Sequence, residues 1–322
     1  MVLIFSDTED SSSSEIIDWL DYLGEPFRRI TELDELSDIH LEVDREDVNS
    51  GFSINGEAIL MKNIKSVFFR RGSIRISPGS PRSTNDNVNF FLDYHYQNDI
   101  KDLAEFLFLE LKLNSYVLGS PFLYKVNKLK MLYDAQSCGL DIPQTSVYSN
   151  KKRVKENYDL KATIMKGVSE TLEIPNSNES NGYVWYTTKF NDESVHSQFW
   201  YTTFQKQIEK SFEIRCFYLD GSFYSTAIFS VNNIGTSIDF RISESNNLSY
   251  AAHKLPAEVE DSLSKLMLLN DINIGSIDLI CDTNGNYYFL EVNPMGQFGF
   301  YSEIVNHGVH RRIAEKLING KK

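Results

Sequence analysis

The chain lacks three features that would assign it to well-defined protein classes. It has only three cysteines in 322 residues, and Cys138, Cys216 and Cys281 are too widely spaced for a metal-binding or redox motif. Because a disulfide framework needs paired spacing, reduced thiols and a cytoplasmic location are expected. The sequence has no apolar run of about 18 residues and no signal-peptide pattern at its start, so no membrane partner is expected.

An excess of positive charge is also missing. The sequence contains 32 lysines and arginines against 45 acidic residues, which gives a net charge of −13. Such a surface repels nucleic acids and anionic lipids, so neither is expected as the main partner. With 41% hydrophobic and 24% charged residues, the composition is that of a folded globular protein. The length indicates two or three domains, and a peptide or small molecule remains as the partner.

The most informative pattern that is present lies near the C-terminus. Residues 274–281 and 287–294 are β-rich and flank Asn284-Gly285, a strong signal for a two-residue hairpin turn. In that register Asp278 lies opposite Glu291, and Asn293 shares their face. Two carboxylates and an amide oxygen are ligands that suit Mg²⁺. An ordinary exposed acidic hairpin is the alternative, and a loop one residue longer would put the carboxylates on opposite faces.

The other face of the same hairpin is predicted to be wholly apolar. An apolar face of a strand pair packs against a core, so the carboxylates would be fixed on a rigid scaffold. The residues assigned to this face are Ile277, Leu279, Cys281, Leu290 and Val292.

Two lysines are suitably placed to bind phosphates that share such a cation. Lys166 ends the apolar run 162–166 beside Gly167, and Lys128 lies at the start of a predicted helix. A triphosphate needs cations along its length. Taken alone, each lysine is more often an exposed surface residue.

The segment Gln205-Lys206-Gln207-Ile208 joins two predicted strands, and its backbone groups could contact a purine edge or simply connect the strands. In the next strand Glu213 and Arg215 share one face, which suits ribose hydroxyls and a phosphate or carboxylate. An ion pair without a function is the alternative. Asp239 and Arg241 place an acid and a base on one face in the same way.

Taken in order, these features resemble the ATP-grasp ligases over about residues 119–300. The resemblance is carried by Lys128, Pro143-x-Thr145, Lys166, Gln205, Glu213, Asp278 and Glu291-Val-Asn293-Pro294. Narrower features resemble the microviridin-type graspetide synthetases, which cyclise ribosomal precursor peptides, and are similar to their grasp-with-spasm maturase branch. These features are Phe204-Gln205, Glu213-x-Arg215, 225–230, Asp239-Phe-Arg241 and 293–297.

The resemblance implies an α/β (α+β) ATP-grasp fold in three parts. An N-terminal α/β pre-ATP-grasp domain would span residues 1–118, a central subdomain 119–205, and a C-terminal subdomain with the metal site 206–322. The strand and helix patterns themselves favour an α/β domain up to about residue 120. The resemblance also implies a homodimer.

Each site residue receives a role from the resemblance. Lys128 and Lys166 would contact the α- and β-phosphates of ATP, the 205–208 segment the adenine, and Glu213 the ribose. Two Mg²⁺ ions would be held by Asp278, Glu291 and Asn293, and the catalytic cations would be Arg215 and Arg241. The chain departs from the family pattern in two places. It has no glycine-rich lid after Lys166, and it has Ser276 where an arginine often precedes the first metal ligand.

The implied substrate is a ribosomally made precursor peptide with a leader and a core. The turn Asn191-Asp192-Glu193 resembles the hairpin that holds a leader in this family, where Asp192 and Glu193 would pair with a basic leader residue. A solvated turn is the alternative. Arg70, Arg71 and Asp239 are further candidates for peptide contacts.

The implied reaction activates Asp or Glu side chains as acyl phosphates. Thr or Ser hydroxyls would then form ω-esters, or Lys amines ω-amides. One alternative is an ATP-grasp ligase that joins a free amino acid to a peptide or protein acceptor. A nucleotide-binding module without catalysis ranks lower, because both lysines and all three metal ligands are present.

Overall fold

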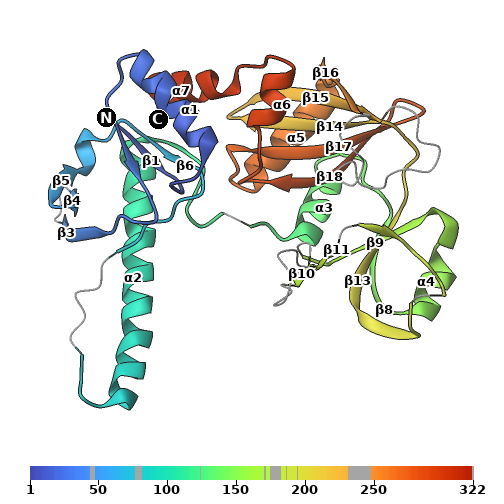
Figure 1. Cartoon of the computed structure of the whole chain (residues 1–322), viewed down its shortest axis with the longest axis horizontal. Helices are drawn as coiled ribbons and strands as arrows, with labels where there is room; N and C mark the ends of the chain where they lie inside the picture. The colour runs from blue at the N-terminus through green and yellow to red at the C-terminus, as the bar shows by residue number, and fades with distance from the viewer. Residues whose placement is uncertain are drawn as a thin grey trace. The chain divides into compact units, whose positions relative to one another are not determined.

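The computed structural model forms two compact units, residues 1–124 with 308–322 and residues 125–307 (Figure 1). It describes all residues except 44–47, 77–81, 124, 170–171, 175–182, 186, 194, 231–247 and 321–322. None of the helices in the described part of the chain combines the length and apolarity needed to cross a bilayer.

The first unit is built on a four-stranded parallel sheet with the strand order β2-β1-β6-β7. The two middle strands are completely buried, as expected for strands covered on both faces. The strands are β1 (Val2–Phe5), β2 (Phe27–Ile30), β6 (Ser66–Phe69) and β7 (Tyr116–Leu118).

Helices and a small antiparallel sheet cover this parallel sheet. Helix α1 (Ser11–Tyr22) packs against α7 (Val309–Asn319), and α7 also contacts β6 and β7. Helix α2 (Asp86–Asn114) adds Leu107 and Leu111 to a core that includes Leu3 and Phe5. Three antiparallel strands join the same core, β3 (Leu36–Val43), β4 (Val48–Ile54) and β5 (Glu57–Leu60), followed by the short helix η1 (Met61–Asn63).

The second unit begins with α3 (Lys128–Ser137) and contains a four-stranded sheet in the order β12-β9-β13-β8. Helix α4 (Lys151–Asn157) packs on this sheet through Val154, beside Tyr158, Phe190 and Phe204. The sheet strands are β8 (Thr145–Asn150), β9 (Thr163–Lys166), β12 (Thr188–Lys189) and β13 (Gln198–Lys206), and η2 (Leu160–Ala162), β10 (Leu172–Ile174) and β11 (Tyr183–Trp185) lie between them in the chain.

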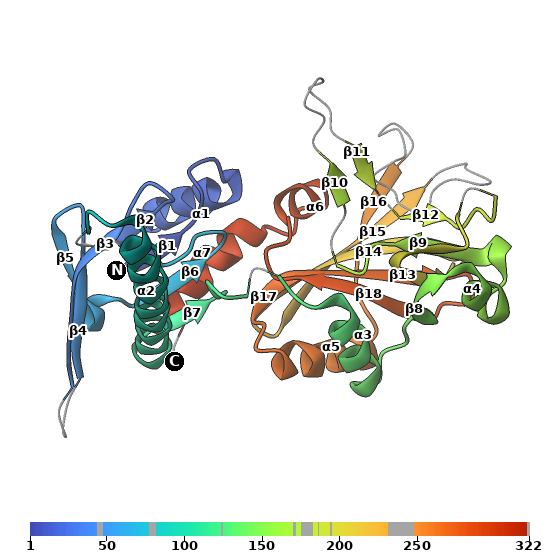
Figure 2. The ribbon, with the colours of Figure 1, turned by 90° about the horizontal axis from the view of Figure 1, so that it is seen from below.

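A five-stranded antiparallel sheet completes the second unit, in the order β16-β15-β14-β17-β18 (Figure 2). One of its faces carries buried residues such as Ile214, Cys216 and Ile277, and helix α3 contacts both β18 of this sheet and α5. Its strands are β14 (Lys210–Leu219), β15 (Ser222–Ser230), β16 (Leu248–His253), β17 (Ile274–Asp282) and β18 (Tyr287–Asn293), and its helices are α5 (Ala257–Leu269) and α6 (Gly299–Ile304).

The unit boundaries differ from the predicted domains at one end. The predicted boundary after residue 118 lies close to the observed division after residue 124. Residues 308–322, predicted within the C-terminal subdomain, belong instead to the first unit, because α7 buries Val309, Ile313 and Leu317 there. The predicted division after residue 205 falls at the end of β13, before the five-stranded sheet begins.

Candidate functional site

The centre of the site is the strand pair β17–β18. Asp278 lies directly opposite Glu291, and Ser276 lies opposite Asn293. Asp278 also lies opposite Arg215 on β14, so it sits between a carboxylate and a guanidinium on neighbouring strands. The predicted opposition of the two carboxylates is therefore present, with Asn293 two residues along the same strand.

The hairpin reaches this register by a different route from the predicted one. Near the turn Cys281 pairs with Tyr287 and Leu279 with Phe289, one residue out of step with the Asp278–Glu291 pair. The loop is therefore one residue longer than a two-residue turn, and its last residue, Gly285, has a positive φ of 88°. A β-bulge between the two registers restores the opposition of the carboxylates.

The bulge changes which side chains fill the core. Phe289 is fully buried opposite Leu279, whereas Leu290 is only half-buried. The prediction that Leu290 belongs to the apolar face was therefore wrong, because it assumed an uninterrupted register. The other four residues assigned to this face are buried, so the charged face still stands on a packed apolar layer.

Basic side chains balance both carboxylates. The Lys128 Nζ lies 2.9 Å from Glu291 Oε2, and the two side chains are about one-third exposed. Arg215 donates to Asp278 Oδ1, and its guanidinium lies 5.8 Å from the centre of the Tyr301 ring. The sequence predicted both cations near anionic groups, but it did not indicate Tyr301.

Lys166 ends β9 and belongs to the same electrostatic cluster. The pKa of its ammonium lies below the usual value, chiefly because the group is buried and also because Lys128 is near. Glu291 and Asp278 act in the opposite direction but do not outweigh burial. Burial opposes ionisation of Glu291, but Lys128, Lys166 and Arg215 outweigh it and hold the pKa of that carboxyl below its usual value. The fold thus brings together five predicted site residues that are up to 163 positions apart in the chain.

Asn293 begins a tight turn against β17. Its Oδ1 accepts a hydrogen bond of 3.0 Å from the Met295 amide, and its carbonyl accepts one of 3.0 Å from the Gly296 amide. A Cβ on Gly296 would lie 2.5 Å from the Ser276 Cβ, so a larger residue has no room there. The position that often carries an arginine is thus packed beneath this turn. The Asn293 oxygen keeps a second lone pair for a cation.

The predicted purine-binding segment connects the two sheets. Gln205 is buried and donates through Nε2 to Thr145 Oγ1 at 2.8 Å. The amides of Lys206 and Gln207 donate to the carbonyls of Gln144 and Ala162. The backbone of the segment is therefore fixed at Lys206 and Gln207 by the residues that directly precede β8 and β9.

Glu213 and Arg215 share one face of β14, as predicted, with Ile214 and Cys216 buried on the other. Lys210 donates to Glu213, a contact that the strand alternation did not indicate. A bulge between Lys210 and Phe212 brings the two side chains to the same face. Arg241 and Asp239 lie outside the described residues.

In the predicted leader-binding turn, Asp192 forms ion pairs with two lysines of the same protein. Asp192 Oδ1 lies 3.0 Å from Lys151 Nζ and Oδ2 lies 2.8 Å from Lys155 Nζ. Hydrogen bonds from Lys155 and Lys151 lower the pKa of the Asp192 carboxyl. Glu193 is exposed, and its amide donates to Asn191 Oδ1 at 3.0 Å.

An open groove of about 940 Å³ lies along α4. Its lining includes Lys151, Lys152, Arg153 and Lys155, with Gln198 from β13. Trp200 and Tyr201, further along the same strand, are 85% and 60% exposed. On a chain with a net charge of −13, this groove is a local concentration of basic side chains.

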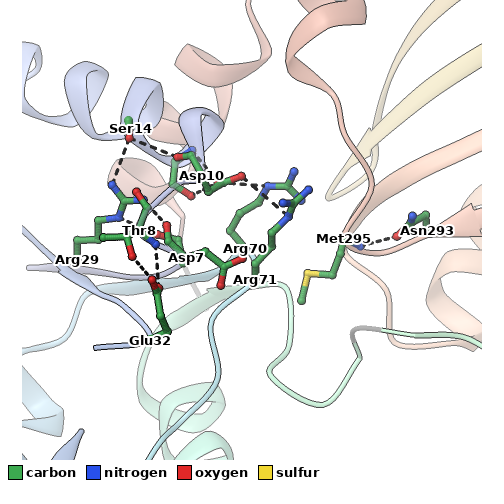
Figure 3. Close-up of polar contacts among 12 residues, drawn as sticks. Asp7, Thr8, Asp10, Ser14, Arg29, Glu32, Arg70, Arg71, Asn293 and Met295 are labelled. Atoms are coloured by element: carbon green, nitrogen blue, oxygen red, sulfur yellow. Dashed lines mark hydrogen bonds and ion pairs between the residues drawn. The ribbon is translucent and has the colours of Figure 1, made fainter. Parts of the chain in front are cut away.

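In the first unit, Arg70 and Arg71 follow β6 and direct their guanidinium groups toward Asp10 (Figure 3). The same view shows Arg29 donating to Ser14 Oγ and to the Asp7 carbonyl, and Glu32 accepting from the Thr8 amide. Arg70 is buried and Arg71 is partly exposed.

The donor set on β17–β18 fits a hard divalent cation. Asp278, Glu291 and Asn293 offer only oxygen atoms, and these residues project from adjacent positions of two paired strands. The depressed pKa of Glu291 keeps its carboxylate ionised and able to bind a cation. These three residues therefore suit Mg²⁺ better than a thiophilic metal.

Comparison with known proteins gives structural relatives only. No protein-family model matches the sequence, and no curated protein matches it. The macrocyclase MdnC, bound with precursor peptide MdnA from Microcystis aeruginosa MRC, is 22% identical, with a TM-score of 0.72 and full coverage of both chains. A RiPP-associated ATP-grasp ligase of Chryseobacterium gregarium, in complex with ADP and leader and core peptides, is 20% identical, with a TM-score of 0.74 and coverage of 100% of this chain and 97% of the other.

A third solved structure, the ATP-grasp ligase PsnB complexed with a minimal precursor variant, Mg and ADP, is 14% identical. Its TM-score is 0.68, and the match covers 98% of this chain and 97% of that one. The chain therefore has the ATP-grasp fold of these ligases over essentially its whole length, which confirms the predicted fold class.

Proposed function

We propose that the protein is an ATP-dependent ligase that cyclises a ribosomally made precursor peptide, with ATP and Mg²⁺ as its requirements. The observation that carries the proposal is the convergence of Lys128, Lys166 and Arg215 on the paired carboxylates Asp278 and Glu291. The structural relatives add support, because they are RiPP-associated ligases and macrocyclases whose structures contain precursor peptides, ADP or Mg.

The nucleotide would occupy the site between the two sheets of the second unit. Lys128 and Lys166 would leave the carboxylates partly and contact the α- and β-phosphates, where their charge is matched more fully. Because the Lys206 and Gln207 amides already donate within the protein, the Ile208 amide would meet the purine edge. The Glu213 carboxylate, which accepts from Lys210 in this structure, would accept from the ribose hydroxyls instead.

Asp278, Glu291 and Asn293 would hold Mg²⁺, in one or two ions, as oxygen ligands. The bound ion would offset charge on the phosphoryl group. Arg215 lies beside Asp278 and would add a fixed positive charge at the same place. Arg241 is proposed for the same task from the sequence resemblance alone.

The reaction would proceed in two transfers. An Asp or Glu carboxylate of the peptide attacks the γ-phosphorus of ATP, and the bond to the β-phosphate oxygen breaks, which leaves ADP and an acyl phosphate. A Thr or Ser hydroxyl then attacks the acyl carbon, loses its proton, and expels phosphate to form an ω-ester. A Lys amine in the same position would give an ω-amide. Positioning and electrostatics are sufficient for both steps.

The groove along α4 is proposed to bind the leader. Asp192 is held by Lys151 and Lys155, so its proposed role is to fix the turn against α4. Glu193 remains the proposed contact for a basic leader residue. Lys152 and Arg153, the basic lining residues that do not pair with Asp192, would contact acidic leader residues, and Trp200 offers an exposed ring on the neighbouring strand.

Three finer points belong to the same proposal. A homodimer is proposed from the family resemblance, and the exposed Phe90, Phe91 and Tyr94 of α2 offer apolar surface for it. Cytoplasmic location agrees with three free cysteines. Ester linkage and membership of the grasp-with-spasm branch rest on the sequence pattern alone.

A ligase for a free amino acid and a peptide or protein acceptor is the competing proposal. It would use the same nucleotide site and differ only in its substrates. The sequence signatures 293–297 and Asp239-Phe-Arg241 favour the precursor peptide, because the resemblance to peptide cyclases rests on them.

The nature of the nucleotide product tests the reaction. Purified protein is incubated with ATP, Mg²⁺ and a small Thr-, Asp- and Glu-rich candidate precursor peptide, with and without hydroxylamine. We expect ADP and phosphate in step with ring formation, and hydroxamates at Asp or Glu when hydroxylamine traps the acyl phosphate. Formation of AMP and diphosphate would contradict the proposed mechanism, and a single amino acid added to the peptide would favour the competing ligase.

A further inference from the structure

The loops after β1 and β6 meet at the point of the parallel sheet of the first unit where the order of the strands reverses. The chain passes from β1 to β2 on one side and later enters β6 on the other side of β1. In open α/β sheets, ligands bind outside the carboxyl ends of the strands at such a switch point. The residues that follow β1 and β6 therefore occupy a position that favours binding.

Two arginines and one aspartate meet at this point. Arg70 Nε lies 3.7 Å from Asp10 Oδ2, and Arg71 Nε lies 4.0 Å from Asp10 Oδ1 (Figure 3). The Arg70 side chain is 4% exposed and that of Arg71 is 37% exposed. One guanidinium is thus enclosed in the protein, and the next one along the chain reaches solvent.

The backbone holds these arginines in a defined place. The Arg70 amide donates to the Phe5 carbonyl at 2.9 Å, and a Cβ on Gly72 would lie 2.6 Å from the Phe5 carbonyl carbon. The loop therefore lies directly against the end of β1. Asp10 is fixed as well, because its carboxylate accepts from the amide and hydroxyl of Ser13 at the start of α1.

The electrostatics of the cluster favour an additional anion. The pKa of Arg70 is lowered to about 10, chiefly because the guanidinium is buried. Asp10 and Asp7 raise this pKa, and the neighbouring Arg71 lowers it further. Burial and the neighbouring guanidinium together outweigh the two acids. A further carboxylate beside Arg71 would reduce the repulsion between the arginines and gain charge-assisted hydrogen bonds.

We infer that Arg71, backed by Arg70, is a carboxylate-binding subsite of the first unit that takes one acidic side chain of the peptide substrate. The identity of the ligand as a peptide rests on the proposed function. A single carboxylate suits the place better than a phosphate, because Asp7 and Asp10 after β1, and Glu32 after the neighbouring strand β2, repel a multiply charged group. Arg71 contacts the ligand, and Arg70 is a positioning residue.

Chemical footprinting of Arg71 tests this subsite without ATP or turnover. The full-length protein is treated with phenylglyoxal, and modification of each arginine is followed by peptide mapping. The probes are acetyl-(Glu-Thr)4-amide, acetyl-(Gln-Thr)4-amide and inorganic phosphate at equal ionic strength. We expect the Glu peptide to slow modification of Arg71 at least about threefold, with no effect from the Gln peptide. Arg75, exposed in the same segment, serves as the internal control.

Equal protection by both peptides, or protection by phosphate alone, would overturn the inference. Kinetics supply a second readout, because Arg71→Gln should raise the KM for the peptide with little change in kcat. Arg71→Lys should bring the KM part of the way back to the native value, and Arg75→Gln should leave the KM unchanged. Footprinting does not require the reaction, so the two proposals can fail separately. Protection of Arg71 without ring formation would support the subsite and contradict the proposed function. Ring formation without protection of Arg71 would support the proposed function and contradict the subsite.

Discussion

The charged face of β17–β18 and the turn at Asp192 look alike in sequence but differ in what supports them. Both present acids that are paired with two or more basic side chains. Asp278 and Glu291 stand on strands whose other face is buried, and their partners come from three other elements. Within the part of the chain that the structure describes, Asp192 forms its ion pairs with the adjacent α4, and its side chain is 40% exposed.

This difference separates a site from a surface contact. Carboxylates that are held close together on a buried scaffold can be relieved by a cation, whereas a turn that pairs with two lysines has already satisfied its charge. An ion pair by itself therefore says little about function. Two other features are better indicators of a functional site: the number of separate elements that supply the paired side chains, and the burial of the strands that carry them.

Loss of a carboxylate on the charged face should have the largest effect. Asp278→Asn or Glu291→Gln should lower kcat for ring formation by at least about 100-fold, because the charge that binds the cation is removed. Peptide mass spectrometry over time measures the rate. Asp192→Asn is the matched control and should keep kcat within about threefold, since exposed pairs contribute little. Similar losses in all three variants would remove the distinction between the two regions.

The buried scaffold gives the next largest effect, on stability. Phe289→Ala should reduce the free energy of unfolding by about 3–5 kcal/mol, because it leaves a cavity opposite Leu279. Leu290→Ala should cost well under half of that, since the bulge leaves Leu290 only half-buried. Urea unfolding followed by circular dichroism compares the two. A larger loss for Leu290→Ala would mean that the hairpin has the uninterrupted register.

The turn beside the charged face should tolerate no side chain at Gly296. Gly296→Ala places a methyl group 2.5 Å from the Ser276 Cβ, which displaces Asn293 and should lower activity about tenfold. Ser276→Gly in the same chain removes that contact and should recover part of the activity. The Mg²⁺ concentration for half-maximal rate is the readout. No recovery in the double variant would contradict the proposed coupling.

Changes in the groove should have the smallest effect on catalysis. Lys152→Ala combined with Arg153→Ala should weaken leader binding about fivefold, because two lining charges are lost, and leave kcat unchanged. Fluorescence anisotropy of a labelled leader peptide measures the affinity. Lys62→Ala, outside the groove, is the control. An unchanged affinity would show that the leader binds elsewhere.

Much of the fold and the site follows from local sequence patterns. The period-2 alternation around Glu213 and Arg215 placed both on one face with Ile214 and Cys216 buried, as the structure has them. The apolar runs at residues 2–5 and 66–69 have the pattern of short buried strands, and they coincide with β1 and β6.

The misses have a common physical cause. A two-residue turn and an uninterrupted register predicted the Asp278–Glu291 pair, but in the structure a longer loop and a bulge compensate each other. A second bulge brings Lys210 beside Glu213. Bulges depend on how a strand packs, and no local pattern marks them. The pairing of Asp192 with Lys151 and Lys155 depends on the tertiary fold in the same way.

The mass of the precursor peptide after incubation with ATP and Mg²⁺ decides whether the strand pair β17–β18 forms the catalytic metal site. The native protein should yield a peptide lighter by one water per ring, and mild base should open rings that are esters. Asp278→Asn, folded to the same extent by circular dichroism, should leave the mass unchanged. Ring formation by the Asp278→Asn variant at the native rate would contradict the assignment of this strand pair as the catalytic metal site.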